Sequence, residues 1–154
     1  MDARTHGSRT RTSAIYKPVM NADAVNAYLS TVYPQSDSFD CLAEEIRPGE
    51  VTVAMRVTDN HLRPGGTVSG PSMFALADLA AYLLVLSHVG EVALAVTTNL
   101  TINFLSKPPQ ADLYAEGRLL KLGKRLAICE IHIHSRENDL LVAQATATYS
   151  IPPR

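Results

Sequence analysis

The segment from residue 73 to residue 89 is apolar at almost every position and contains one acidic residue, Asp78. Ser69 or Gly70 can cap the start of a helix over this segment, and Gly90 fits its end. Apolar side chains fall on several of its faces, so we expect the helix to be enclosed rather than half exposed. The run is shorter than the roughly 18 to 20 apolar residues that cross a bilayer, and an acid lies near its centre, so no membrane span is predicted.

Strands are predicted on both sides of this helix. A shorter helix over 21–33 precedes a hairpin over 39–59, and four strands are expected between residues 92 and 151. In residues 92–104 the apolar positions share one parity and the polar positions, Thr97 among them, share the other, so one face of that strand is expected to pack. Strands in runs around one central helix favour an α+β fold with an antiparallel sheet.

Composition argues against several classes of function. The 14 Lys and Arg are matched by 15 Asp and Glu, so the chain lacks the basic excess typical of nucleic-acid-binding proteins. Cys41 and Cys129 lie far apart, with no Cys or His at a zinc-ligand spacing, and are expected to be reduced thiols. His132 and His134 share a strand face, but no acidic or cysteine partner accompanies them, so no metal site is predicted.

The N-terminal region is polar and contains no apolar signal segment. Residues 1–14 are expected to form a disordered tail, and residues 15–154 a single domain. With reduced cysteines and no signal peptide, a cytoplasmic location is predicted.

Asp78 and Gly70 are the first candidates for chemistry. A partly desolvated carboxylate can act as a base, although a structural hydrogen-bond network would give the same pattern. The free N–H of Gly70 could polarise a carbonyl, although an ordinary helix cap is the alternative. Eight residues of helix span about 12 Å, too far for both groups to act on one carbonyl from the same helix. If both act on one substrate, they come from two protomers of a homodimer.

Four strings identify a family resemblance: GTVSGPSMFALADLA, AVTTNLTINFLSKP, LLKLGKRLAICEIHI and LVAQATATYSI. Together they resemble the hotdog-fold acyl-CoA thioesterases, in particular the phenylacetate-degradation type, over residues 40–151. The resemblance implies a long central helix wrapped by a six-stranded antiparallel sheet. It also implies homodimers or homotetramers that hydrolyse acyl-CoA at the dimer interface, without a cofactor or metal and with coenzyme A as part of the substrate.

The resemblance assigns roles to three residues. Asp78 matches the catalytic carboxylate, which attacks the thioester or activates water. Gly70 matches the residue whose N–H polarises the thioester carbonyl from the partner chain. Thr97 falls where the family often has a Ser or Thr that positions the nucleophilic water.

Three positions depart from the family pattern of Asn followed by His-Gly-Gly. Arg63 stands at the Asn position, Ser69 at the His position and Pro71 at the second Gly position. Ser69 can still donate one hydrogen bond. Both a shifted specificity and a loss of catalysis are compatible with these changes.

A basic turn could hold the phosphates of coenzyme A. Lys121, Lys124 and Arg125 surround it, although charges at a hairpin tip are often only solvated. Arg63 is a second candidate phosphate partner, and His61 is a candidate for substrate contact.

These observations leave three hypotheses. The first is an acyl-CoA thioesterase that uses Asp78 and Gly70, with Ser69 and Thr97 assisting. The second is a non-catalytic protein that binds acyl-CoA or a small ligand. The third, a hotdog dehydratase, is less well supported because the helix-entry region lacks a histidine that could pair with an acid.

Overall fold

The computed structural model describes residues 15–154, so the expectation for residues 1–14 lies outside the described residues. Its two helices are α2 (Ala22–Val32) and α3 (Gly70–Val89), and two short 3-10 turns, η1 and η2, cover Pro34–Phe39 and Asp59–His61. The strands are β1 (Cys41–Arg47), β2 (Glu50–Met55), β3 (Val96–Phe104), β4 (Leu113–Leu122), β5 (Leu126–Ser135) and β6 (Leu141–Ser150).

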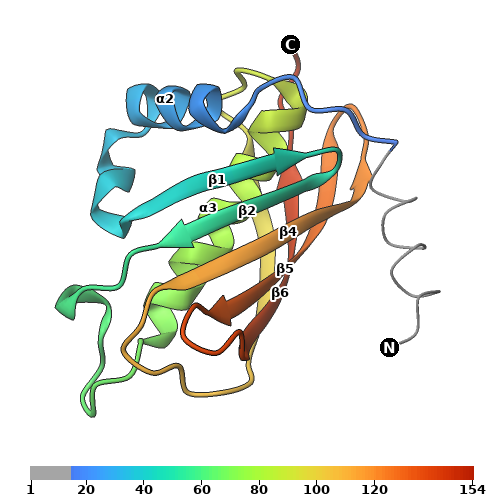
Figure 1. Ribbon diagram of the computed structural model, residues 1–154. Coiled ribbons are helices and arrows are strands. Elements are labelled where there is room, and N and C mark those ends of the chain that lie inside the picture. Colours follow the sequence, from blue (N-terminus) through green and yellow to red (C-terminus); the bar gives the residue numbers. More distant parts are fainter. Residues whose placement is uncertain (1–14) are drawn as a thin grey trace.

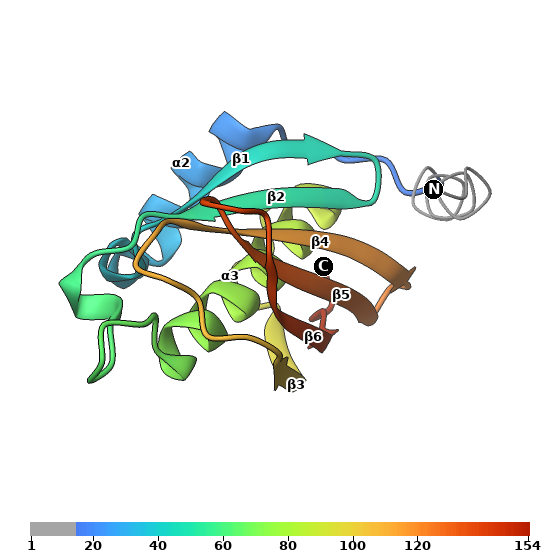
Figure 2. The same cartoon turned by 60° about the horizontal axis from the view of Figure 1, so that its bottom comes forward.

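The strands form one six-stranded sheet in the order β1-β2-β4-β5-β6-β3, and every neighbouring pair is antiparallel. The sheet curves around α3, as Figures 1 and 2 show. The predicted α+β hotdog architecture, with a long central helix against a six-stranded antiparallel sheet, is confirmed.

Helix α3 begins and ends where the sequence indicated. The Ser69 hydroxyl caps it by accepting the Ser72 N–H at 3.2 Å, and Gly90 ends it with a φ of 96° that favours glycine. Among the described helices, α3 is long and apolar enough to cross a membrane, but most of its apolar surface is buried inside the protein. Core helices pass the same test of length and composition.

Strand β3 lies at one edge of the sheet and differs from its prediction. It begins at Val96, because residues 92–95 form a turn instead of continuing the strand. Its apolar side chains were expected to pack, yet Val96 and Phe104 are 56% and 52% exposed. An edge strand has a neighbour on one side only, which leaves much of its surface uncovered.

A β-bulge in β3 changes which side chains face the helix. Thr97 pairs with Tyr149, and Asn99 pairs with the β6 residue just before it, so Thr98 is an extra residue. The extra residue reverses the alternation, and Thr97 therefore lies on the same face of the sheet as Leu100. The predicted placement of Thr97 on the opposite, polar face was wrong for this reason.

Helix α2 is fastened to the other edge of the sheet. The Asn26 amide donates to the carbonyl of Ala43 in β1 at 2.9 Å and accepts the N–H of Ala43 at 2.9 Å. One side chain thus satisfies both backbone groups of an edge-strand residue. The contact holds α2, and the η1 turn that follows it, beside β1 and α3 (Figure 1).

His88 links the end of α3 to the β1–β2 turn. Its Nδ1 donates to the Leu84 carbonyl at 2.9 Å, and its Nε2 accepts the Gly49 N–H at 2.8 Å. These two bonds require a neutral ring with its proton on Nδ1. Burial lowers the pKa of His88 from its ordinary value of 6.5, which agrees with that assignment.

Replacing His88 by Ala is expected to lower the free energy of unfolding by about 2 kcal/mol, because the Gly49 N–H loses its partner. The effect should depend on pH. Below pH 6.5 the unfolded chain protonates His88 while the folded chain resists, so wild-type stability falls as pH falls, by at most about 1.4 kcal/mol per pH unit from this group. Urea unfolding between pH 7.5 and 5 measures both effects.

The His88→Ala variant should lose part of this pH dependence. His134→Ala, which removes a half-buried histidine near the end of β5 and away from Gly49, should retain the contribution of His88. Equal pH dependence in wild type and His88→Ala would contradict the assignment of a neutral ring.

Candidate active site

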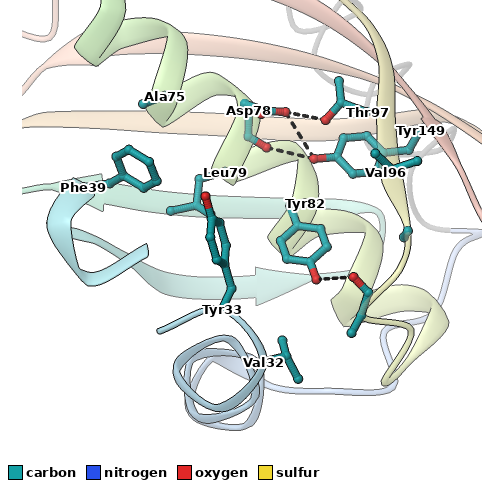
Figure 3. Close-up of a pocket in the computed structure, with 12 residues that line it drawn as sticks. Val32, Tyr33, Phe39, Ala75, Asp78, Leu79, Tyr82, Val96, Thr97 and Tyr149 are labelled. Atoms are coloured by element: carbon teal, nitrogen blue, oxygen red, sulfur yellow. Dashed lines mark hydrogen bonds between the residues drawn. The ribbon is translucent and has the colours of Figure 1, made fainter. Parts of the chain in front are cut away.

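A cavity of about 350 Å³ lies between α3, the α2–η1 segment and the start of β3. Asp78, Thr97 and Tyr149 form its polar part, as Figure 3 shows. The rest of the lining is apolar except for two tyrosine hydroxyls. It includes Val32, Tyr33 and Phe39 on one side and Ala75, Leu79 and Tyr82 of α3 on the other. A cavity of this volume falls within the range of small-molecule sites.

Two hydroxyl groups hold the Asp78 carboxylate. Thr97 Oγ1 donates to Asp78 Oδ1 at 2.5 Å. Tyr149 Oη lies 3.2 Å from Oδ1 and 3.2 Å from the Asp78 backbone carbonyl oxygen. Within residues 15–154 no group donates to Oδ2, so this oxygen is available to water or to a ligand.

The charge of Asp78 affects its neighbours. Burial, and then the negative charge of Asp78, raise the pKa of Tyr149 above its ordinary range. The same two causes raise the pKa of the Cys129 thiol to about 12. Tyr149 therefore stays protonated and serves as a donor, and Cys129 stays an unreactive thiol.

A second cavity, of about 410 Å³, surrounds the first residue of α3. Its lining includes Gly70, Arg63, Lys107 and Phe104. No acceptor for the Gly70 N–H is found in the described part of the chain. A Cβ at Gly70 would lie 3.4 Å from the Phe104 ring, so a glycine permits close approach here.

The loop before α3 is a compact turn. The Arg63 N–H bonds the Thr67 carbonyl at 2.9 Å, and the Gly66 N–H bonds the Arg63 carbonyl at 3.0 Å. Gly65 and Gly66 have φ values of 102° and 84°, which other residues rarely adopt. This turn places Arg63 and Thr67 in the lining of the second cavity.

The sequence candidates thus fall into two groups. Asp78 and Thr97 meet at the first cavity, and Gly70 and Arg63 meet at the second. None of the site residues predicted from the sequence lines both cavities.

Ser69 lies beside Gly70, but its hydroxyl is already engaged. It accepts the Ser72 N–H and lies 2.8 Å from the Ser72 hydroxyl, which itself donates to the His61 carbonyl. Since the Ser72 proton goes to His61, the Ser69 proton goes to Ser72. A role for Ser69 on a substrate would require it to release this bond.

His61 does not line either cavity. Its ring is buried, its Nδ1 accepts the Thr58 N–H at 2.8 Å, and its Nε2 lies 3.6 Å from an Asp40 carboxylate oxygen. These contacts give His61 a role in shaping the loop, and the substrate contact that the sequence suggested stays a prediction.

The basic turn with Lys121, Lys124 and Arg125 also lies outside both cavities. It is nevertheless at the Asp78 end of the molecule, because Leu126 pairs with Ser150 and Ser150 pairs with Val96. Two strand spacings, about 10 Å, separate the turn from the start of β3.

Sequence reasoning missed Tyr149 and Lys107. Tyr149 has the same parity as the alanines of β6 that pack on α3, so its hydroxyl was detectable as a polar atom on an apolar face. Lys107 follows β3 directly, but nothing in the local pattern distinguishes it from a solvated lysine.

No group of three or more His, Cys, Asp or Glu side chains that could hold a metal occurs within residues 15–154. The two cavities therefore present a carboxylate, hydroxyls, one backbone N–H and two cations as their polar groups.

Comparison with known proteins identifies the family. The family model described as the thioesterase superfamily matches residues 65–142, which is half of the chain, and the chain belongs to this family. Hydrolase activity is supported at that level.

Three similar proteins illustrate the relationship. The crystal structure of a proposed thioesterase from Silicibacter sp. TM1040 is 48% identical, with a TM-score of 0.82 over 90% of this chain and 96% of that one. A phenylacetic acid degradation protein from Thermus thermophilus, solved as a mutant, is 26% identical, with a TM-score of 0.68 over 77% and 99%. Human acyl-coenzyme A thioesterase 13 is 28% identical over 66% of this chain and 72% of its own.

A double-mutant cycle on stability can test the Tyr149–Asp78 contact. Because a hydrogen bond to a charged group is stronger than a neutral one, Tyr149→Phe and Asp78→Ala are expected to show a coupling energy of about 1 kcal/mol or more. Chemical unfolding at pH 7 of the wild type, the two single variants and the double variant gives this value.

Tyr114→Phe is the matched control, because the Tyr114 hydroxyl also donates to an aspartate, the exposed Asp139, away from Asp78. Its effect should add to that of Asp78→Ala within about 0.5 kcal/mol. Additive effects for Tyr149 as well would contradict the contact.

Proposed function

We propose that the protein is an acyl-CoA thioesterase that hydrolyses a thioester to a free acid and coenzyme A. One observation carries the proposal: an Asp78 carboxylate, held by two hydroxyl donors, stands at the polar end of an apolar cavity. The membership in the thioesterase superfamily and the similarity to an acyl-coenzyme A thioesterase support it.

In this mechanism Asp78 either attacks the thioester carbon or removes a proton from the attacking water. Thr97 and Tyr149 fix Oδ1, so that Oδ2 points its lone pairs to the water or the substrate. The thioester C–S bond breaks, the sulfur leaves as the thiol of coenzyme A after taking a proton, and water supplies the hydroxyl of the acid.

The Gly70 N–H would stabilise the negative charge that develops on the thioester oxygen. It is the first residue of α3, where the helix dipole adds to the effect, and the missing N–H of Pro71 leaves it without a neighbouring donor. Because about 12 Å of helix separates Gly70 from Asp78, the Gly70 that serves one Asp78 belongs to a second copy of the chain.

The edge strand β3 supports such a pairing. Its outer backbone groups are open, and the apolar side chains of Val96, Phe104 and the following Leu105 are more than half exposed. Phe74, which lies on α3 one turn before Asp78, is 41% exposed. An isologous contact of two β3 edges would cover these side chains and bring the Asp78 cavity of one copy toward the Gly70 cavity of the other. A homodimer, alone or paired into a homotetramer, is the proposed assembly.

Two groups of cations could bind the phosphates of coenzyme A. Arg63 and Lys107 line the Gly70 cavity, and the turn with Lys124 and Arg125 lies at the Asp78 end of the same chain. In the proposed homodimer these two groups approach each other across the interface, which suits a ligand with several phosphates.

A second candidate is a protein that binds acyl-CoA without hydrolysing it. The observation that favours it is the engaged Ser69 hydroxyl, which leaves fewer donors at the thioester than the family's histidine would supply. Calorimetric binding of an acyl-CoA with no turnover would support this candidate.

Asp78→Asn is expected to reduce kcat for acyl-CoA hydrolysis by roughly 100-fold or more, since the amide can neither attack nor accept a proton. Steady-state assays on a panel of acyl-CoAs measure the loss. Asp23→Asn, an equivalent change on the exposed first turn of α2, should retain wild-type activity. Equal activity of wild type and Asp78→Asn would remove Asp78 from the mechanism.

Mixing two inactive variants tests the shared site. Gly70→Pro deletes the proposed N–H donor and should lower kcat by about 100-fold, whereas Gly70→Ala, which keeps the N–H and adds only a Cβ 3.4 Å from the Phe104 ring, should lower it far less. After unfolding and refolding together, Gly70→Pro and Asp78→Asn chains should regain about a quarter of wild-type activity, because half of the random dimers are mixed and each has one intact site. No recovery in mixtures shown to contain mixed dimers would contradict a site built from two copies.

A further inference from the structure

We infer that the Asp78 cavity receives the acyl group and selects uncharged, apolar acyl groups of medium size. The Tyr33–Phe39 pair forms the wall that limits their length. This inference rests on the proposed thioesterase function and specifies the substrate class of the same site.

The layout of the cavity gives the acyl group its direction. Asp78, Thr97 and Tyr149 gather on one side, and Figure 3 shows Tyr33 and Phe39 well away from them. A carbonyl that reaches Asp78 Oδ2 therefore points its substituent along Leu79 toward the two rings.

The lining excludes charged acyl groups. Apart from Asp78, no charged side chain of the described residues lines the cavity. A second carboxylate on an acyl group that points toward Tyr33 and Phe39 would find no cation in this lining and would be repelled by Asp78, and burying an unpaired charge is costly. The cavity therefore rejects carboxyacyl groups such as succinyl.

The volume indicates the size of the acyl group that fills the cavity. An apolar cavity of about 150 Å³ holds a benzene ring, and a water-sized group occupies about 30 Å³. At 350 Å³, the cavity accommodates roughly ten carbon-sized groups with space for water at the carboxylate. Medium alkyl chains and single aromatic rings fit within this volume, whereas a palmitoyl chain exceeds it and would extend past the Tyr33–Phe39 pair.

The end wall is an aromatic contact. The Tyr33 and Phe39 rings meet edge to face, with centroids 6.5 Å apart. Tyr33 is 38% exposed, so its ring can be removed without opening the core. Ala75, which also lines the cavity, offers the opposite change because a larger side chain there would fill the space.

Hydrolysis of acetyl-, octanoyl-, palmitoyl- and succinyl-CoA by the wild-type protein tests the substrate class. Since each buried methylene contributes about 0.8 kcal/mol, kcat/KM for octanoyl-CoA should exceed that for acetyl-CoA by about 100-fold or more. Palmitoyl- and succinyl-CoA should each be at least about tenfold poorer than octanoyl-CoA.

Two variants test the wall itself. Tyr33→Ala should raise kcat/KM for palmitoyl-CoA relative to octanoyl-CoA by about tenfold, and Ala75→Leu should lower the octanoyl value while sparing acetyl-CoA. Tyr28→Ala is the matched control, because Tyr28 lies on α2 but outside the cavity, and it should keep the wild-type order of substrates. Thermal unfolding confirms that each variant folds.

The outcomes separate the two proposals. If the wild type hydrolyses none of the four thioesters, the thioesterase function fails and this inference fails with it. If hydrolysis occurs but palmitoyl- or succinyl-CoA is preferred, or if Tyr33→Ala leaves the ratio of kcat/KM for palmitoyl-CoA to that for octanoyl-CoA unchanged, only the inference is overturned. The wild-type panel decides the substrate class even if a variant does not fold.

Discussion

The packing of α3 against the curved sheet is the interaction on which the molecule depends. The helix is apolar on nearly all faces, so it must be enclosed, and the sheet curves around it. Asp78 is its one acidic residue, and a carboxylate in such a place is costly unless donors reach it. Thr97 of β3 and Tyr149 of β6 supply those donors. The packing that stabilises the fold thus also orients the proposed catalytic group.

Much of the fold could be predicted from the sequence because the relevant signals are local. The ends of α3 follow from Ser69 and Gly90, and the α+β class follows from runs of alternating residues. The face of Thr97 could not be predicted, since one extra residue at Thr98 reverses the alternation and depends on pairing with β6. The candidate site could be predicted only in part. Asp78 differs from its apolar neighbours in the sequence, whereas Lys107 does not differ from an ordinary solvated lysine.

The cavity beside Asp78 depends on contacts between distant parts of the chain. Asn26 fastens α2 to Ala43, and this places Tyr33 and Phe39 opposite α3. No pattern in residues 21–40 indicates that two aromatic rings of this segment face a carboxylate some forty residues later in the chain. The sheet and α3 therefore determine the fold of this chain, whereas the shape of the cavity beside Asp78 also depends on the segment that precedes them.

The exposed edge of β3 has a consequence for how the chain is produced in the cell. An edge strand with backbone groups open on one side and exposed apolar side chains such as Val96 and Phe104 is a template to which an extended peptide can add. If the proposed homodimer forms through this edge, a newly made chain is most vulnerable to aggregation between the closing of its sheet and the meeting of a second copy. Synthesis of several chains on one messenger RNA, which keeps nascent copies close together, would shorten that interval.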